Sequence, residues 1–106
     1  MDFRILGPLQ VLDGGRDVTP SRRKQRALLA LLLLHAGKFV TVDEAIDALW
    51  GASAPPAARN AVQGHISALR KILGADRIDT GEGYELQVGD GELDQDRFER
   101  LLIDGA

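Results

Sequence analysis

Residues 57–74 read AARNAVQGHISALRKILG, and this stretch carries both an apolar stripe and a polar face without acids. At about 100° per residue, one side of a helix collects four apolar residues: Val62, Ile66, Leu69 and Leu73. The opposite side collects small and polar residues: Asn60, Gln63, Gly64, Ser67 and Lys71. The stretch therefore predicts a helix over residues 57–73 that ends at Gly74 and buries only one of its faces.

Two further helices are predicted before this one. Thr41 and Glu44 have the spacing of a capping box, so a helix is expected to follow them and to stop at Gly51. Further upstream, Thr19 and Pro20 are typical of an N-cap and a first helical position. They predict a helix that runs to about residue 36.

The first turns of that upstream helix are basic, with Arg22, Arg23, Lys24 and Arg26. Cations at a helix N-terminus oppose the helix dipole and cost stability. Two interpretations stay open: a solvated basic collar, or a phosphate or partner contact, for which the candidates are Arg22, Arg23 and Lys24. The apolar run that follows, residues 27–34, is far shorter than the about 20 residues that a membrane span needs.

Strand patterns flank the helices on both sides. Residues 3–12 alternate in polarity, and the turn residues 13–15 lead into a short return strand over 16–18, which predicts an N-terminal hairpin. Residues 77–80 and 84–88 predict a second hairpin, in which Gly81 and Gly83 are expected to supply freedom for positive φ. A last helix is predicted over residues 94–103.

Composition excludes several classes of function. The 106-residue chain has no cysteine and two histidines, which excludes a disulfide framework, a thiolate zinc site and a cysteine nucleophile and leaves little for any metal site. No cofactor is expected. Neither a signal peptide nor a membrane segment is visible, so a cytoplasmic protein is expected.

The net charge of −3 argues against a nucleic-acid partner if it is taken as a sum. The charges are unevenly distributed, however. Residues 16–77 hold ten basic and five acidic residues, a net of +5, whereas residues 78–106 hold two and nine, a net of −7. The three helices predicted before the second hairpin therefore lie in a basic block, and the net acidity belongs to the second hairpin and the tail.

Three helices followed by a glycine-tipped hairpin predict an α+β fold, the winged helix-turn-helix, in which one helix enters the DNA major groove. Asn60 and Gln63 can pair with adenine edges, and Ser67 can donate or accept a hydrogen bond. Gly64 weakens a helix by about 1 kcal/mol relative to Ala, and close approach to a duplex would explain its presence. The candidates for phosphate contacts are Arg59, Arg70 and Lys71.

Other interpretations of the same residues remain open. Polar residues on an exposed helix face are also ordinary solvated residues, His65 could lie at the edge of the core, and Trp50 could lie within it. A winged helix can also be a protein-interaction module with weak or no DNA binding, which the acidic hairpin favours and the acid-free helix face opposes. An enzyme is not expected, because His65 and Ser67 at i and i+2 on a helix point apart.

Ordered motifs resemble known regulators. Residues 49–51 (LWG), 65–74 (HISALRKILG) and 81–86 (GEGYEL) resemble the OmpR-type DNA-binding domain. Residues 6–9 (LGPL) and 24–32 (KQRALLALL) resemble the narrower Streptomyces antibiotic regulatory protein (SARP) family, which uses that domain. Residues 93–101 (LDQDRFERL) resemble the start of that family's all-helical bacterial transcriptional activation domain.

The resemblance implies a DNA-binding domain over residues 1–90, then a linker and the start of a truncated activation domain over 91–106. It implies an activator that binds promoter direct repeats in double-stranded DNA as side-by-side copies and helps recruit RNA polymerase. At the positions that touch the DNA backbone in OmpR-type domains this chain has Trp50, Asn60 and Tyr84. The recognition-helix stretch contributes His65, Ser67 and Arg70.

One position departs from the family pattern. The residue before the first glycine of the hairpin is often an Arg that enters the minor groove, and here it is Thr80, with Glu82 and Glu85 nearby. Thr80 is therefore a weaker candidate for DNA contact. Affinity is expected to rely more on the recognition helix.

Overall fold

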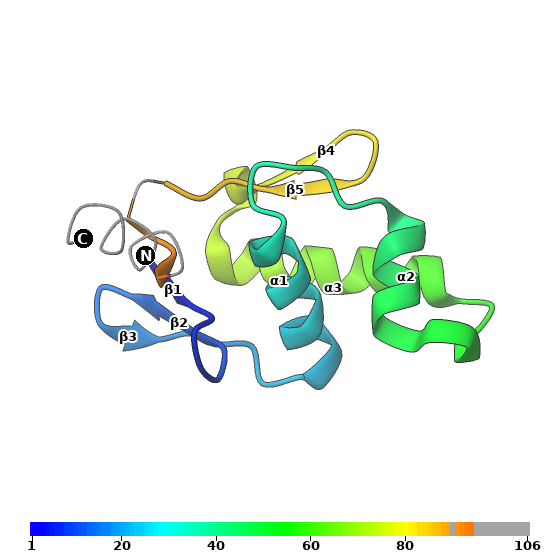
Figure 1. Cartoon of the computed structure of the whole chain (residues 1–106), viewed down its shortest axis with the longest axis horizontal. Helices are drawn as coiled ribbons and strands as arrows, with labels where there is room; N and C mark the ends of the chain where they lie inside the picture. Colours follow the sequence, from blue (N-terminus) through cyan, green and yellow to red (C-terminus); the bar gives the residue numbers. More distant parts are fainter. Residues whose placement is uncertain (90, 95–106) are drawn as a thin grey trace, which may run out of the picture. The chain divides into compact units, whose positions relative to one another are not determined.

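A computed structural model describes residues 1–89 and 91–94 of the chain (Figure 1). It divides into two compact units. One comprises Pro20–Gln87, and the other joins Met1–Thr19 to residues 88, 89 and 91–94. The two units are described separately.

The larger unit contains three helices: α1 (Arg23–Leu34), α2 (Val42–Trp50) and α3 (Ala58–Leu73). The helix α1 packs against both α2 and α3. It buries Leu28, Leu29, Leu32 and Leu33, and α3 buries the predicted stripe, Val62, Ile66, Leu69 and Leu73. The stripe prediction is therefore confirmed, and the three helices share one apolar core.

The predicted start of the first helix is wrong. The helix α1 begins at Arg23 after Arg22, which has no side-chain cap, and not after Thr19. The Thr19 hydroxyl instead accepts a hydrogen bond from the Val11 N–H (2.9 Å) and donates one to the Asp17 carboxylate (2.6 Å). Thr19 is of a residue type that commonly caps helices, but its hydroxyl makes its hydrogen bonds within the unit that contains Met1–Thr19.

The predicted N-cap of α2 at Thr41 is confirmed, and Glu44 contacts the Thr41 hydroxyl and not the Thr41 backbone N–H. The Thr41 hydroxyl accepts from the Glu44 N–H (3.1 Å), and the same hydroxyl lies 3.2 Å from the Glu44 carboxylate. Gly51 follows the helix with φ of 61° and opens a short 3₁₀ turn, η1 (Gly51–Ser53). Gly74 follows α3 with φ of 109° and leads into a second 3₁₀ turn, η2 (Ala75–Arg77).

The second hairpin consists of β4 (Ile78–Thr80) and β5 (Tyr84–Leu86), paired antiparallel with Asp79 opposite Glu85. This hairpin is the wing of the fold, and Figure 1 shows it alongside the segment that joins α1 to α2. In that segment Val40 exchanges two backbone hydrogen bonds of 2.8 Å with Tyr84. The wing is thereby anchored to the helices through its second strand.

The wing glycines are required for a different reason from the predicted one. Neither Gly81 nor Gly83 has positive φ. A Cβ at Gly83 would come within 2.1 Å of the Val40 carbonyl oxygen, and one at Gly81 would come within 2.9 Å of the Phe39 ring. These glycines allow close packing, so the expectation of positive φ was wrong.

The N-terminal unit contains β1 (Asp2–Arg4), β2 (Gln10–Asp13) and β3 (Arg16–Asp17), which form an antiparallel sheet in that order. The predicted hairpin is present between β2 and β3, where Gly14 and Gly15 both have positive φ, as a two-residue turn requires. The predicted single strand over 3–12 is wrong, because residues 6–8 are a bend and β1 pairs back on β2. Gly7-Pro8 makes this bend, as expected for turn residues.

Residues 91–94 pair with β1. The Phe3 N–H donates to the Glu92 carbonyl (2.6 Å), Leu93 forms a parallel bridge to Phe3, and the Asp94 carboxylate accepts from the N–H groups of Ile5 (2.8 Å) and Leu6 (3.1 Å). The start of the segment predicted to be a linker thus completes the N-terminal sheet. The helix predicted over 94–103 lies, beyond residue 94, outside the described residues.

These elements confirm the predicted α+β winged helix-turn-helix, with a sheet before three helices and a hairpin after them. Among the helices of the described residues, none is both long and apolar enough to cross a membrane.

Candidate nucleic-acid interface

The outer face of α3 is exposed, as the periodicity predicted. Its exposed residues are Arg59, Asn60, Gln63, Gly64, Ser67 and Lys71. The helix contains no acidic residue. A Cβ added at Gly64 would meet no atom within 4 Å, so nothing in the described part of the chain packs on this position. The face is open to an external partner and carries donors, acceptors and cations without a carboxylate of its own.

One cation of this face already has a partner. The Arg59 guanidinium lies 2.6 Å from the Asp43 carboxylate of α2, and the two side chains are 63% and 80% exposed. An ion pair this exposed contributes little to stability, because water screens it. Arg59 can therefore exchange Asp43 for a phosphate at small cost.

Arg70 and Thr80 are brought together by the fold. The Arg70 Nη2 donates to the Ile78 carbonyl (2.9 Å) and to the Thr80 hydroxyl (2.7 Å). Arg70 is half-buried, whereas Lys71 beside it is exposed. The sequence nominated Arg70 and Thr80 separately for DNA, but in the folded chain they join the end of α3 to β4.

Trp50 and Lys24 form a second contact that the sequence did not reveal. Trp50 ends α2 and is half-buried, and the Lys24 Nζ lies 5.0 Å from the centroid of its ring. The same Nζ donates to the Leu49 carbonyl at 3.3 Å. Lys24 is thus directed inward, onto the end of α2. No sequence signal links positions 24 and 50, because only the tertiary packing of α1 on α2 brings them together.

His65 lies at the edge of the exposed face and is half-buried. Its partial burial lowers its pKa below the ordinary value, and the positive charges of Arg22 and Lys24 lower that pKa further. The lowered pKa favours the neutral form of the side chain.

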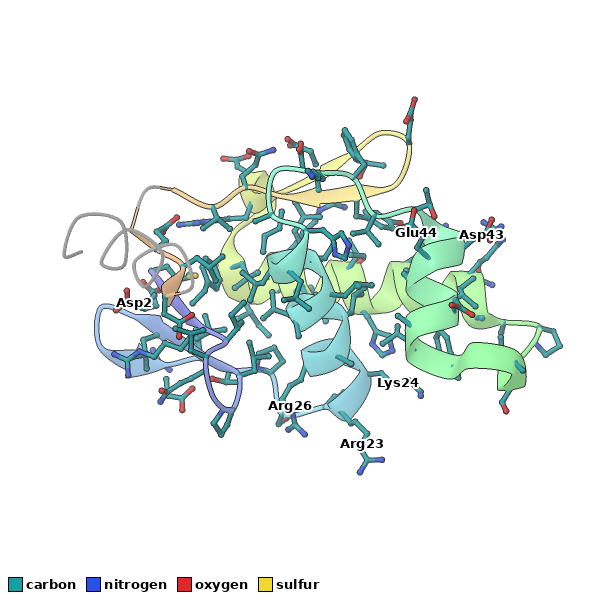
Figure 2. All side chains as sticks on the ribbon, in the orientation of Figure 1. Asp2, Arg23, Lys24, Arg26, Asp43 and Glu44 are labelled. Carbon is teal, nitrogen blue, oxygen red and sulfur yellow. The ribbon has the colours of Figure 1, made fainter. Side chains whose placement is uncertain are left out.

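The rest of the predicted basic collar differs from Lys24. Arg22 and Arg23 are exposed, and within the described part of the chain neither forms a salt bridge. The Arg26 guanidinium donates to the Ser21 carbonyl at 2.8 Å. Figure 2 shows Lys24 extending from α1 toward α2, whereas Arg23 points away from both helices. Arg22 and Arg23 are therefore the collar residues available to a partner.

The wing exposes acidic side chains but only a small part of the Tyr84 side chain. Tyr84 is only 8% exposed, so it can offer DNA a small part of its surface. Asp79 and Glu85 face each other across the strands, and the Gln87 amide donates to both, at 2.7 and 2.9 Å. Gln87 offsets the repulsion expected of two facing carboxylates. The sequence did not single out this residue.

A metal site is not formed by the described residues, among which no group of three or more His, Cys, Asp or Glu side chains gathers.

Comparisons with known proteins identify the family and the fold. The family model described as "Transcriptional regulatory protein, C terminal" matches residues 16–86. The chain is 39% identical over 105 residues to the transcriptional regulatory protein EmbR of Mycobacterium tuberculosis, covering 92% of the chain and 27% of EmbR. It is 39% identical over 101 residues to the regulatory protein AfsR of Streptomyces coelicolor, covering 93% of the chain and 10% of AfsR.

A third relative is the regulatory protein DnrI of Streptomyces peucetius, 35% identical over 117 residues, with 99% of the chain and 43% of DnrI covered. The solved structure of Mycobacterium tuberculosis EmbR in complex with a low-affinity phosphopeptide matches with a TM-score of 0.90 and 38% identity. That match covers 98% of this chain and 29% of the EmbR chain. The chain therefore spans less than half the length of these relatives.

These relatives are regulators of the SARP type, and their match confirms the resemblance seen in the sequence motifs. From this match and from the three-helix fold with its wing, we conclude that the chain belongs to the family of transcriptional regulatory proteins with an OmpR-type winged-helix domain.

Proposed function

We propose that this chain binds double-stranded DNA by placing the exposed face of α3 in the major groove. The observation that supports the proposal is the division of α3 into a buried apolar stripe and an exposed face without acids. The helix is held by its stripe, so its outer face is presented as a rigid surface. Membership of a transcriptional regulatory family points in the same direction.

Each residue of this face has a proposed role. Asn60 and Gln63 read adenine edges, and Ser67 hydrogen-bonds to a base or a phosphate. Gly64 lets the helix backbone approach the duplex, which its open surroundings permit. Arg59 and Lys71 bind phosphates and thereby fix the position of the helix.

Residues around the face extend the proposed site. Trp50 and His65 contact the DNA backbone beside α3, and the exposed Arg22 and Arg23 bind further phosphates. Arg70, Thr80 and Tyr84 contribute chiefly by holding the wing in place. The acidic wing stays out of the minor groove, because carboxylates there would face the negative potential of the DNA.

The wider role is proposed from the resemblance to SARP regulators. Residues 1–90 form the DNA-binding part, and the residues from 91 onward lead into an activation domain. Copies of the protein bind side by side on promoter direct repeats and help to recruit RNA polymerase at the nucleoid. The family membership supports a regulatory role, and these details depend on it.

Fluorescence anisotropy with labelled duplexes tests the proposal. The chain is titrated onto a duplex that carries a promoter direct repeat and onto the same duplex with the repeat scrambled. We expect tighter binding to the repeat, and Asn60→Ala or Gln63→Ala should reduce that preference by about 1–3 kcal/mol for the base pair read. Lys71→Ala is the matched control, because it should weaken binding to both duplexes alike. Equal affinity for both duplexes at every salt concentration would contradict base reading by α3.

A protein-interaction module is the second candidate function. The paired acids Asp79 and Glu85, held by Gln87 on the wing, favour it. If this candidate were correct, the chain would bind neither duplex. It would instead bind a partner such as RNA polymerase in a manner lost when both acids are neutralised.

A further inference from the structure

We propose that Lys24 is a positioning residue that fixes the indole of Trp50 for its contact with DNA. The inference deepens the proposed function and rests on it. It assigns to Lys24 an internal role in place of the external phosphate contact that its place in the basic collar suggested. Three features of the described residues support it.

The first feature is that one ammonium group makes two contacts with the end of α2. The Lys24 Nζ lies 5.0 Å from the centroid of the Trp50 ring and 3.3 Å from the Leu49 carbonyl oxygen. The first contact is a cation–π interaction with the ring face, and the second is a hydrogen bond to the helix end. Together they hold both the ring and the backbone that carries it.

The second feature is that the last turn of α2, where a cation stabilises a helix, contains no cation of α2 itself. Its last turn contains no basic residue and does contain Asp47. A cation near a helix C-terminus interacts favourably with the dipole and the free carbonyl groups. Lys24 supplies this charge from α1, which explains why α1 tolerates it in a first turn where it opposes the dipole.

The third feature is that α2 ends at Trp50 and that an exposed segment follows it. The residue has non-helical φ and ψ of −125° and −21°, and Gly51 follows with φ of 61°. Every residue from 51 to 57 is exposed. A mobile aromatic side chain loses conformational entropy when it binds, so a contact that fixes it beforehand raises affinity.

Trp50 is the only tryptophan of the chain, so its fluorescence reports on this contact directly. The experiment compares the 106-residue chain with Lys24→Met, Lys24→Arg and the matched control Arg23→Ala. In the absence of DNA, we expect Lys24→Met to increase the fast motion of the indole in time-resolved anisotropy. Lys24→Arg, which keeps the charge and the donors, should restore the wild-type decay, and Arg23→Ala should leave it unchanged.

A double-mutant cycle with DNA tests whether Lys24 acts through Trp50. The probe is a fluorescein-labelled mixed-sequence duplex, because backbone contacts also support non-specific binding. Lys24→Met should weaken binding about two- to fivefold when Trp50 is present and should have almost no effect in a Trp50→Ala chain. Lys24→Arg should bind like the wild type.

Several results would overturn the inference. An equal loss of affinity in both backgrounds would make Lys24 a direct phosphate contact, and an unchanged indole decay in Lys24→Met would show that it does not hold the ring. If the wild-type chain bound no duplex while Lys24→Met still freed the indole, the proposed function would fail, and the role of Lys24 in DNA binding would fail with it. The fluorescence measurement thus tests the contact between Lys24 and Trp50 independently of the proposed DNA binding.

Discussion

Two glycines of this chain show how the same residue type can serve structure at one position and function at another. Gly83 lies where a Cβ would meet the Val40 backbone, whereas Gly64 lies where a Cβ would meet nothing. The first is required by packing in the folded chain. The second lowers helix stability without any gain that the described residues show, which is expected if its partner is DNA.

Alanine substitutions should therefore act in opposite directions at these two positions. Gly83→Ala should destabilise the chain by about 3 kcal/mol, because the backbone at Val40 must shift. Gly64→Ala should stabilise it by about 0.5–1 kcal/mol, since Ala is the better helix former, and should weaken DNA binding. Urea unfolding and anisotropy measure the two effects. A stabilised Gly64→Ala chain with unchanged DNA affinity would remove the argument for close approach.

His65 gives the folded chain a pH dependence. Burial, followed by the charges of Arg22 and Lys24, lowers its pKa below the value in the unfolded chain. Between those two pKa values the unfolded chain binds more protons, so stability is lost as the pH falls through the folded pKa. Urea unfolding at about pH 7.5 and about pH 5.5 should show a smaller loss for His65→Gln than for the wild type. His35→Gln is the control for removal of an imidazole, and an equal loss in all three chains would contradict the account.

At the scale of elements, the wing is held by Arg70 as well as by strand pairing. Its guanidinium joins the end of α3 to Ile78 and Thr80. Arg70 and the next residue, Lys71, should therefore differ in effect, although both are cations on the same helix. Arg70 should affect the stability of the wing, and Lys71 should affect the affinity for DNA.

Arg70→Met should lower the free energy of unfolding by about 1–2 kcal/mol, because it leaves two acceptors without their donor. Amide exchange in β4 should accelerate accordingly, as measured by hydrogen–deuterium exchange. Lys71→Met should change stability by less than about 0.5 kcal/mol and weaken DNA binding. If Arg70→Met left exchange in β4 unchanged, its two hydrogen bonds would not be holding the wing.

The sequence predicted those elements whose signals are local. The apolar stripe of α3, the Thr41 cap of α2 and the two-residue turn at Gly14 and Gly15 each depend on a few neighbouring residues. The same holds for the exposed face of α3, which follows from periodicity once one face is known to be buried.

The features that the sequence did not predict depend on contacts between distant residues. Thr19 has the type of an N-cap, but its hydroxyl is engaged by Val11 and Asp17. Gly83 suggested positive φ, but its function is packing on Val40. Lys24 and Trp50 meet only because α1 packs on α2. In each case tertiary packing decided between uses of a residue that local patterns could not distinguish.

At the scale of the whole molecule, the N-terminal unit is closed by residues that follow the wing. The Asp94 carboxylate accepts from two backbone N–H groups, at Ile5 and Leu6. This unit is therefore made from two segments that are separated in the chain by the whole of the larger unit, Pro20–Gln87. The acid-rich end of the chain has a structural use here, separate from any partner.

Asp94→Asn should loosen this closure, because an amide offers one acceptor oxygen and no charge where the carboxylate offers two oxygens. The amides of Ile5 and Leu6 should exchange about tenfold faster, which corresponds to about 1.4 kcal/mol of local stability. Asp13→Asn, at an exposed acid of the same sheet, is the control. Unchanged exchange at Ile5 and Leu6 would show that the carboxylate does not hold β1.

The net charge of −3 does not describe the surface that is proposed to bind DNA. The exposed face of α3 and the free collar residues Arg22 and Arg23 all lie in the basic block of the chain, whereas nine of the sixteen acidic residues lie from residue 78 onward, in the wing and beyond it. An overall acidic protein can thus present a basic surface to DNA. What governs affinity is the number of phosphates that this surface neutralises.

The salt dependence of DNA binding tests the central claim most directly. The association constant for one promoter duplex is measured over a range of salt concentrations for the wild type, Lys71→Ala and the control Arg26→Ala, whose guanidinium is engaged by the Ser21 carbonyl. The logarithm of the constant should fall steeply with the logarithm of salt for the wild type and for Arg26→Ala, and less steeply by about 0.9 for Lys71→Ala. A slope near zero for the wild type, or equal slopes for all three chains, would contradict the claim that the outer face of α3 binds DNA.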